Sequence, residues 1–333
     1  MEEPVARSPF PRTGSVGPAA WVELVRAPAA LTVPGDVIAG AVSACRPLGR
    51  RVVGLAAAST CLYWAGMALN DYADRETDAR ERSHRPLPSG RVRPGTALTV
   101  AAACTAGGLG LAALSGGRRS LCTAVPLATL VWAYDLSLKS TPLGPAAMAG
   151  ARALDVLLGA TAPGGPGTEV PLRRALRPAA LTAAHTGAVT VLSRREVEGA
   201  HPALPAAALT VTAAVTAAAA APRAALRHAT PHNATTPAPH PPRAARRPFF
   251  GTPAQGVSAV LAGLYGMVAG AAQYAAVRDP RPDRVQRAVR DGIHAMVPLQ
   301  ASSTARAGAV TAAVSVSALL PLARRLGRRV SVT

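Results

Sequence analysis

The residues best suited to chemistry form a run of carboxylates between positions 70 and 78, which reads N-D-Y-A-D-R-E-T-D. On a helix that turns about 100° per residue, Asp71, Asp74 and Asp78 fall within about 60° of one another. Three carboxylates on one face repel one another unless a cation lies among them. Hard oxygen ligands favour Mg²⁺ or Ca²⁺, and Mg²⁺ typically binds one or two carboxylates, several waters and substrate phosphates.

The run has a second interpretation, as a solvated acidic helix end that is paired with neighbouring arginines. The segment that follows, S-H-R-P-L-P-S-G-R-V, contains Arg85 and a rigid Pro/Gly turn. A cation beside such a turn suits an anion-binding loop. The sequence therefore favours a combined metal and anion site, while the simpler interpretation stays open.

The elements that must position these residues are long uncharged blocks. Charged residues make up 16% of the 333 positions, against about 25% in soluble domains. There are 24 residues without a charge between Arg93 and Arg118, and 30 between Arg247 and Arg278. A helix needs about 20 apolar residues to cross a membrane. The sequence therefore predicts an all-α integral membrane protein with nine spans, near 28–45, 51–70, 96–115, 120–138, 143–162, 178–194, 203–222, 255–277 and 295–322.

The charge pattern argues against a nucleic-acid partner, although the net charge is +19. The charges lie in clusters between uncharged blocks, as in membrane proteins. Lysine and arginine divide equally between the two predicted sides, so they indicate no orientation. The acids of the two acidic loops fall on one side, which predicts a polar site on one membrane face: Asp71, Asp74, Glu76, Asp78, Glu81, Glu196 and Glu198.

Three segments differ in composition from the spans. We expect residues 1–20 to be a disordered tail, residues 21–322 to be the membrane domain and residues 323–333 to be a basic tail. Within the membrane domain, 223–253 is a Thr/Pro/His/Arg tract whose prolines forbid a continuous helix. A low-complexity, solvent-exposed loop is expected there, in preference to a metal site at His228, His232 and His240.

The pattern N-D-x-x-D-x-x-x-D followed by R-P-L-P-S-G resembles the first aspartate-rich motif of the UbiA superfamily of intramembrane prenyltransferases. Within that superfamily the chain is most similar to the EboC-like branch. The resemblance covers residues 20–200 well and 255–320 loosely. It implies a nine-helix bundle that uses Mg²⁺ to bind an isoprenyl diphosphate. The positions in register with the motif are Asn70, Asp71, Asp74, Asp78 and Arg85.

A second segment, Y-D-L-S-L-K-S-T from Tyr134, is similar to the family pattern Y-x-x-x-L-K-x-T. The resemblance implies that Lys139, the single lysine of the chain, contacts the diphosphate. Without the resemblance, a lone lysine at a helix end would be a snorkelling anchor. The aromatic residues predicted nearest the site are Tyr63, Trp64, Tyr72 and Tyr134, which either stabilise a cation or mark the membrane interface.

The second aspartate-rich motif, expected after the sixth span, departs from the family pattern. The segment reads S-R-R-E-V-E-G-A, with Ser193 in place of the first aspartate and Glu196 on an acidic position. Glu196 and Glu198 could bind a second Mg²⁺, but residues two apart do not share a helix face. Arg194 and Arg195 would instead contact phosphate directly. A short amphipathic loop is the alternative.

Charged residues also occur inside predicted spans. Arg152 and Asp155 lie three positions apart in the fifth span, a spacing that permits an internal salt bridge lining a cavity. Asp36 in the first span is a similar case, and Gln300 in the last span is expected to face inward.

The sequence thus predicts Mg²⁺-dependent transfer of a prenyl group from an isoprenyl diphosphate to a small or lipophilic acceptor, in a multi-pass protein of a bacterial cell membrane. Asn70, Asp71, Asp74, Asp78 and Glu196 would bind the metal, and Arg85 and Lys139 would neutralise the departing pyrophosphate. Asn70, Tyr63, Tyr134, Arg194, Glu196 and Glu198 would contact substrate, and membrane lipids would surround the bundle. Two alternatives stay open: a non-catalytic lipid-diphosphate binder or transporter, and a membrane scaffold.

Overall fold

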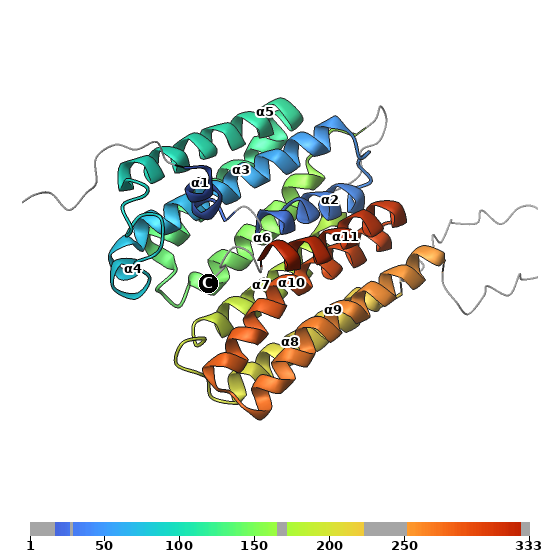
Figure 1. Ribbon diagram of the computed structural model, residues 1–333. Helices are drawn as coiled ribbons and strands as arrows, with labels where there is room; N and C mark the ends of the chain where they lie inside the picture. The colour runs from blue at the N-terminus through green and yellow to red at the C-terminus, as the bar shows by residue number, and fades with distance from the viewer. Residues whose placement is uncertain (1–16, 27–28, 165–171, 223–251, 328–333) are drawn as a thin grey trace, which may run out of the picture.

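The computed structural model describes residues 17–26, 29–164, 172–222 and 252–327. These residues form α-helices, one 3₁₀ turn and one π-helical turn, with no strand among them (Figure 1). The prediction of an all-α fold is confirmed. The α-helices are α1 (Pro18–Leu24), α2 (Pro34–Ser43), α3 (Arg50–Ala73), α4 (Arg75–Glu81), α5 (Pro94–Ala133), α6 (Gly144–Ala160), α7 (Arg173–Ser193), α8 (Ala203–Ala220), α9 (Pro253–Arg278), α10 (Pro282–Arg306) and α11 (Val310–Gly327).

Among the residues that the structure describes, four helical elements are long and apolar enough to cross a membrane. They are α3, α8, α9 and the combined element Pro94–Leu138, which joins α5 to the π-helical turn Tyr134–Leu138. The predicted spans 96–115 and 120–138 both lie in this element, on either side of Gly117. The backbone there has φ 65° and ψ −151°, a conformation open to glycine, so the helical direction changes without a loop.

The predicted count of nine helices is not confirmed, because the described residues contain eleven α-helices. Three features account for the difference: the two predicted spans in Pro94–Leu138 form one helical element, which removes one helix, and two further features add three. The predicted last span, 295–322, is divided between α10 and α11 around Gly308, which has a φ of 101°. Two short helices, α1 and α4, lie outside the predicted spans and are too short to cross a membrane.

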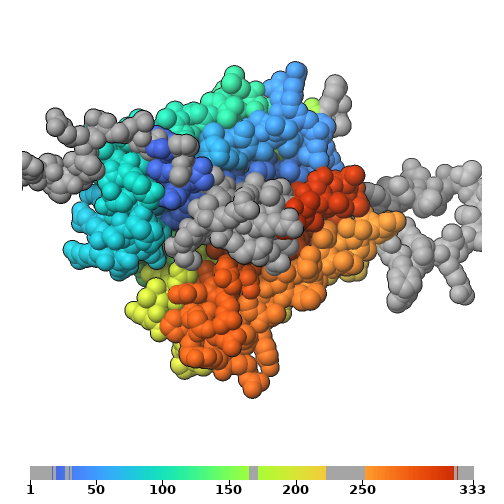
Figure 2. Space-filling model, viewed as in Figure 1, coloured from blue at the N-terminus to red at the C-terminus, as the bar shows by residue number. Residues whose placement is uncertain are grey.

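The bundle has two sides, with α3 and α5 packed together on one and α8, α9 and α10 on the other (Figures 1 and 2). Between them, α2 packs against α6 and α6 against α7. Glycine permits the closest of these approaches. A Cβ at Gly40 of α2 would overlap the carbonyl oxygen of Val156, and one at Gly159 of α6 would overlap that of Val37. Such small-residue packing is typical of membrane helices.

The predicted tails and loop fall largely outside the described residues. Helix α1 begins at Pro18 and helix α11 ends at Gly327. Of the predicted tails 1–20 and 323–333, the structure therefore describes residues 17–20 and 323–327. Of the predicted loop 223–253, Thr252 and Pro253 are described, where they begin α9; His228, His232 and His240 lie outside.

Candidate active site

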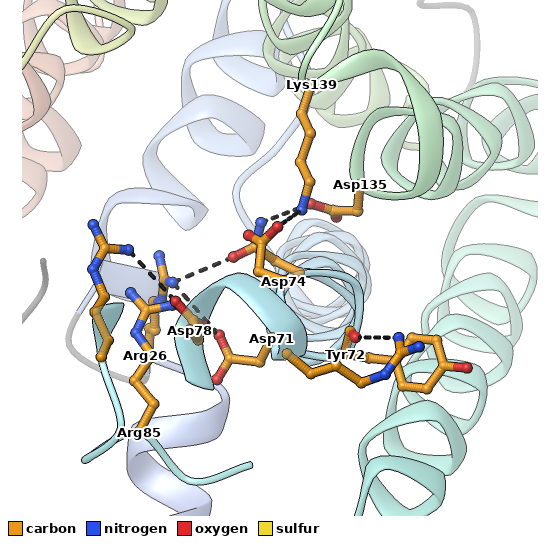
Figure 3. Close-up of polar contacts among 11 residues, drawn as sticks. Arg26, Asp71, Tyr72, Asp74, Asp78, Arg85, Asp135 and Lys139 are labelled. Atoms are coloured by element: carbon orange, nitrogen blue, oxygen red, sulfur yellow. Dashed lines mark hydrogen bonds and ion pairs between the residues drawn. The ribbon is translucent and has the colours of Figure 1, made fainter. Parts of the chain in front are cut away.

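The first acidic run lies where α3 ends and α4 begins (Figure 3). The helix is interrupted at Asp74, which is the C-cap of α3 and has φ −88° and ψ 1°. Asp71 and Asp78 are buried, with 4% and 2% of their surfaces exposed, and Asp74 is half-buried. The prediction of one continuous helical face is therefore wrong, since the three carboxylates come from two helices and the junction between them.

Cations from other segments contact each of these carboxylates. Arg85 Nη1 lies 2.9 Å from Asp78 Oδ2 and 3.6 Å from Asp71 Oδ1. Lys139 Nζ, at the end of the π-helical turn, lies 2.5 Å from Asp74 Oδ1, and Figure 3 shows it reaching toward that carboxylate. The structure therefore brings Arg85 and Lys139 together with the acidic run.

The oxygen atoms at this site fit a hard cation. Asp71 Oδ1 is buried and accepts no hydrogen bond, and its nearest described cations, on Arg26 and Arg85, are 3.6 Å away. A buried carboxylate oxygen without a donor is costly, and a bound Mg²⁺ would relieve that cost. Within the described ranges, no three His, Cys, Asp or Glu side chains converge on one metal position, since arginine and lysine lie between the carboxylates.

Arg26 is a site residue that the sequence analysis missed. It follows α1, and its Nη2 donates to Asn70 Oδ1 at 3.4 Å and lies 3.6 Å from Asp71 Oδ1. Its φ of 44° is in the left-handed region, which a non-glycine residue rarely adopts. Local pattern gave no signal for this contact, because 44 positions separate Arg26 from Asn70.

Asp135 was also missed, although it lies inside the Y-D-L-S-L-K-S-T segment. Its side chain is buried, and its Oδ1 accepts a hydrogen bond of 3.2 Å from Asn70 Nδ2. The π-helical turn Tyr134–Leu138 widens the helix at this point, as such turns often do at functional sites. Asn70 is thus held between Arg26 and Asp135.

The second acidic segment, which follows α7, is more exposed. Glu198 is exposed and pairs with Arg195 at 2.9 Å. Glu196 is half-buried; burial raises the pKa of its carboxyl group, while Arg82 acts in the opposite direction. In the described contacts neither glutamate touches the first acidic run. Arg194 does approach it, because it donates to the carbonyl oxygens of Thr141 and Ser140, next to Lys139, at 2.6 and 3.2 Å.

A cavity of about 240 Å³ adjoins the site and is lined at one end by Arg26, Asn70 and Asp135. Most of its wall is apolar, from side chains of α3, α5 and α6 such as Leu62, Val131 and Met148. Tyr63 and Tyr134 line it, in agreement with their predicted position near the site. Tyr72 has a different environment: the guanidinium of Arg75 lies 4.8 Å from its ring centroid.

Ser59, Arg152 and Asp155 line the cavity away from the acidic run. The predicted salt bridge between Arg152 and Asp155 is wrong. Arg152 Nη2 lies 2.7 Å from Asp36 Oδ2, because the glycine contacts between α2 and α6 bring Asp36 close to Arg152. Asp155 Oδ1 instead accepts a hydrogen bond from Ser59 Oγ at 2.5 Å.

Gln300 of α10 completes this buried cluster. Its Nε2 donates to Asp36 Oδ1 at 2.8 Å and to the carbonyl oxygen of Thr32 at 2.7 Å. The prediction that Gln300 faces inward is confirmed, since the residue is 2% exposed.

Comparison with known families gives one match that covers most of the chain. The family model described as "UbiA prenyltransferase family" matches residues 32–290. A digeranylgeranylglyceryl phosphate synthase from Methanopyrus kandleri is 41% identical over 129 residues, which are 37% of this chain and 45% of that protein. One from Natronomonas pharaonis is 35% identical over 150 residues, 43% of this chain and 52% of that protein. The chain therefore spans about half the length of these curated relatives.

Solved structures share the fold over almost their whole length. A structure reported for digeranylgeranylglyceryl phosphate synthase in membranes has a TM-score of 0.57 at 15% identity, and the match covers 88% of this chain and 98% of that one. A UbiA homologue from Archaeoglobus fulgidus, solved bound to GPP and Mg²⁺, has a TM-score of 0.51 at 14% identity, covering 89% and 99%. At such identities the likeness concerns the fold alone.

Proposed function

This chain belongs to the UbiA prenyltransferase family, and we propose that it transfers a prenyl group from an isoprenyl diphosphate to a small or lipophilic acceptor in the membrane. The observation that carries the proposal is the interleaving of Asp71, Asp74 and Asp78 with Arg85 and Lys139 beside an apolar cavity. Carboxylates suit a metal, cations suit a diphosphate, and an apolar cavity suits a hydrocarbon chain. The three lie side by side here.

Asn70, Asp71, Asp74 and Asp78 would hold Mg²⁺, with Glu196 as a further carboxylate from the second segment. Their donor atoms are all oxygen, the chemistry that Mg²⁺ prefers. When bound, Mg²⁺ neutralises diphosphate oxygens as a Lewis acid. The A. fulgidus homologue that was solved with GPP and Mg²⁺ supports this choice of cofactor and donor.

Arg85 and Lys139 stabilise the negative charge that develops as pyrophosphate departs. The allylic C–O bond breaks with its electron pair on the pyrophosphate, a lone pair of the acceptor bonds to the allylic carbon, and the acceptor loses a proton. Fixed charges in a site that excludes water are effective at this step. The rings of Tyr63 and Tyr134 line the cavity and can stabilise the allylic cation.

The edge of the site next to Lys139 would complete substrate binding. Arg194, held by the carbonyl oxygens of Ser140 and Thr141, would extend the cationic surface that receives the diphosphate. Glu196 and Glu198 would contact the substrate from the second segment.

The protein would act as a multi-pass membrane enzyme. The described part of the chain supports this, with four helices that are long and apolar enough to cross a membrane. We place it in the EboC-like branch, with nine spans, in a bacterial cell membrane whose lipids surround the bundle, and with the site at one membrane face.

A second candidate function is the binding or transport of a lipid diphosphate without turnover. One observation favours it: the second segment has Ser193 in place of an aspartate, and its Glu198 pairs with Arg195. Such a protein would bind the donor but release no pyrophosphate.

Pyrophosphate release separates the two candidates. Purified protein in detergent would be given prenyl diphosphates of several chain lengths, with a membrane-lipid extract as acceptor, in Mg²⁺ or in EDTA. If the protein is an enzyme, pyrophosphate release should require Mg²⁺ and disappear in Asp74→Ala. Asp283→Asn, a matched control that changes an exposed carboxylate at the start of α10, should retain release. Donor binding without release from any donor would favour the binder, and absence of both would contradict the proposal.

A further inference from the structure

The cavity beside the acidic run ends on polar side chains, although most of its wall is apolar. Asn70 lines the end next to the acidic run, and Ser59, 11 positions earlier on α3, lines the far end together with Asp155 of α6. At about 1.5 Å per residue the two ends lie about 16 Å apart along α3. We call Ser59 and Asp155 the polar floor of the cavity. Its depth bears on the length of the prenyl chain that the cavity would hold.

The polar floor is tied into a buried network. Ser59 Oγ donates to Asp155 Oδ1 at 2.5 Å, and both residues are buried. The neighbouring Arg152 pairs with Asp36 at 2.7 Å, and Asp36 also accepts a hydrogen bond of 2.8 Å from Gln300. Displacing these groups would leave buried polar atoms without partners, which is costly. A hydrocarbon chain therefore stops at the floor and does not push it aside.

Packed apolar side chains fill the space beyond the floor. Leu55 of α3 and Leu158 of α6, each about one turn further from the acidic run, are fully buried. They belong to one hydrophobic cluster with Val37 of α2. A packed core does not admit additional carbon groups without strain. The cavity is therefore closed at this end by a polar layer and then by an apolar one.

The depth of the cavity sets one limit on the donor. An extended carbon chain advances about 1.2 Å per bond, a third of the roughly 3.6 Å that an extended peptide residue spans. An isoprene unit adds four such bonds, or about 5 Å. A geranyl chain then reaches about 10 Å, a farnesyl chain about 15 Å and a geranylgeranyl chain about 20 Å. The side chains of the floor shorten the available depth to less than about 16 Å, so geranylgeranyl is too long.

The volume of the cavity sets a stricter limit, because the methyl branches of a prenyl chain make it wide as well as long. About 240 Å³ holds roughly eight groups the size of a water molecule, at about 30 Å³ each. A methylene group is of similar size. The ten carbon atoms of a geranyl chain are close to this limit, whereas the fifteen of a farnesyl chain exceed it clearly.

We propose that the polar floor of Ser59 and Asp155 restricts this protein to short prenyl donors, with geranyl diphosphate preferred, farnesyl diphosphate used poorly and geranylgeranyl diphosphate excluded; the proposal rests on the proposed prenyl transfer. Dimethylallyl diphosphate is short enough to bind, but it leaves the lower half of the cavity unfilled. Since affinity rises with the apolar surface that is buried, geranyl diphosphate is the better donor of the two.

A panel of donors tests the limit. Full-length protein in detergent receives dimethylallyl, geranyl, farnesyl or geranylgeranyl diphosphate with Mg²⁺ and a membrane-lipid extract. Pyrophosphate release gives kcat/KM for each donor, and equilibrium binding gives each Kd. We expect the highest kcat/KM for geranyl diphosphate, a value about 10-fold lower for farnesyl diphosphate and one about 100-fold lower for geranylgeranyl diphosphate, the range that carbon groups without room produce in a tight pocket.

Two substitutions move the limit in opposite directions. Leu62 lies one turn from Ser59 in the cavity wall, and Leu62→Ala frees the space of about three carbon groups. It should raise kcat/KM for farnesyl relative to geranyl diphosphate by about 10-fold. Ala151 lies one turn from Asp155 in the wall, and Ala151→Leu fills that space. It should lower kcat/KM for geranyl diphosphate by about 10- to 100-fold and leave dimethylallyl diphosphate unaffected. That retained activity shows that Ala151→Leu has folded, so the proposal stays testable if Leu62→Ala does not fold.

Ala57→Leu is the matched control. Ala57 is also on α3, two positions from Ser59, but its side chain is exposed and does not line the cavity. The added carbon groups therefore leave the cavity unchanged, and the order of the four donors should stay the same. All variants are measured in one detergent, so the partition of long donors into micelles cancels from the comparison.

Three results would overturn the inference: a kcat/KM for geranylgeranyl diphosphate equal to or above that for geranyl diphosphate, a folded Leu62→Ala variant with an unchanged order of donors, or an Ala151→Leu variant that loses geranyl and dimethylallyl diphosphate equally while dimethylallyl diphosphate still binds. If the donors bind without release, their Kd values test the same order. Absence of Mg²⁺-dependent binding for all four donors would instead contradict the proposed prenyl transfer, so the two failures are distinguishable.

Discussion

The two acidic segments follow comparable helices, α3 and α7, yet they are built differently. In the first, Asp71 and Asp78 are almost fully buried, and Arg26, Arg85 and Lys139 reach the carboxylates from three other segments. In the second, the partner of Glu198 is Arg195, three positions away, and both side chains are exposed.

This difference indicates where the bundle holds a site. An exposed pair three residues apart contributes at most a few tenths of a kcal/mol and forms without tertiary structure. Buried carboxylates with distant cations exist only when several helices pack, and they are kept despite the cost of burial. We therefore expect substitutions in the first segment to have large effects on activity and those in the second to have small ones.

The largest effect is expected from Asp71→Asn, which removes the charge of a buried carboxylate whose Oδ1 has no hydrogen-bond donor. A metal ligand stabilises the transition state by several kcal/mol. Its loss would therefore lower kcat/KM by about three orders of magnitude. Mg²⁺-dependent pyrophosphate release measures it. A loss of less than about tenfold, 1.4 kcal/mol, would place Asp71 outside the metal site.

Lys139→Met should have the next largest effect. It keeps the length of the side chain but removes the cation 2.5 Å from Asp74 Oδ1, so the departing pyrophosphate loses an electrostatic partner. The expected decrease in kcat is about 10²–10³-fold, measured at saturating donor and Mg²⁺. A variant that alters only the donor KM would assign Lys139 to binding alone.

A smaller effect is expected from Glu196→Gln, which tests whether the half-buried glutamate of the second segment assists the metal. A supporting residue typically changes metal affinity by about 10- to 100-fold, and we expect the lower end of that range. The Mg²⁺ concentration that gives half-maximal activity measures it. If that concentration does not change, the second segment contributes no ligand.

The smallest effect is expected from Glu198→Gln, because its carboxylate is exposed and its described partner is Arg195. The donor KM should rise by about twofold at most, as expected for an exposed carboxylate, and the Mg²⁺ requirement should stay at the level of the unmodified protein. A loss comparable to that of Asp71→Asn would show that the two segments contribute equally and would remove the contrast between them.

Local pattern predicted the helices and the first segment well. Uncharged blocks located the four described helical elements that are long and apolar enough to cross a membrane. The register of Asp71, Asp74 and Asp78 with Arg85 predicted their common site. The break at Asp74 was missed, since D-x-x-D-x-x-x-D fits a continuous helix equally well.

Tertiary contacts set the limit of prediction from sequence. Arg26 reaches Asn70 from 44 positions away, and nothing local marks it. Arg152 pairs with Asp36 and not with Asp155, because glycines bring α2 against α6. The spacing of Arg152 and Asp155 on α6 permitted a salt bridge, but the packing of α2 against α6 gave Arg152 a different partner.

The most direct test of the account is equilibrium binding of geranyl diphosphate at increasing Mg²⁺ to the unmodified protein, Asp71→Asn and Glu198→Gln. We predict that Mg²⁺ tightens binding to the unmodified protein and to Glu198→Gln alike, and that Asp71→Asn loses this dependence. Binding that does not respond to Mg²⁺ in any of the three, or an equal loss in both variants, would contradict a metal-diphosphate site built on the first acidic segment.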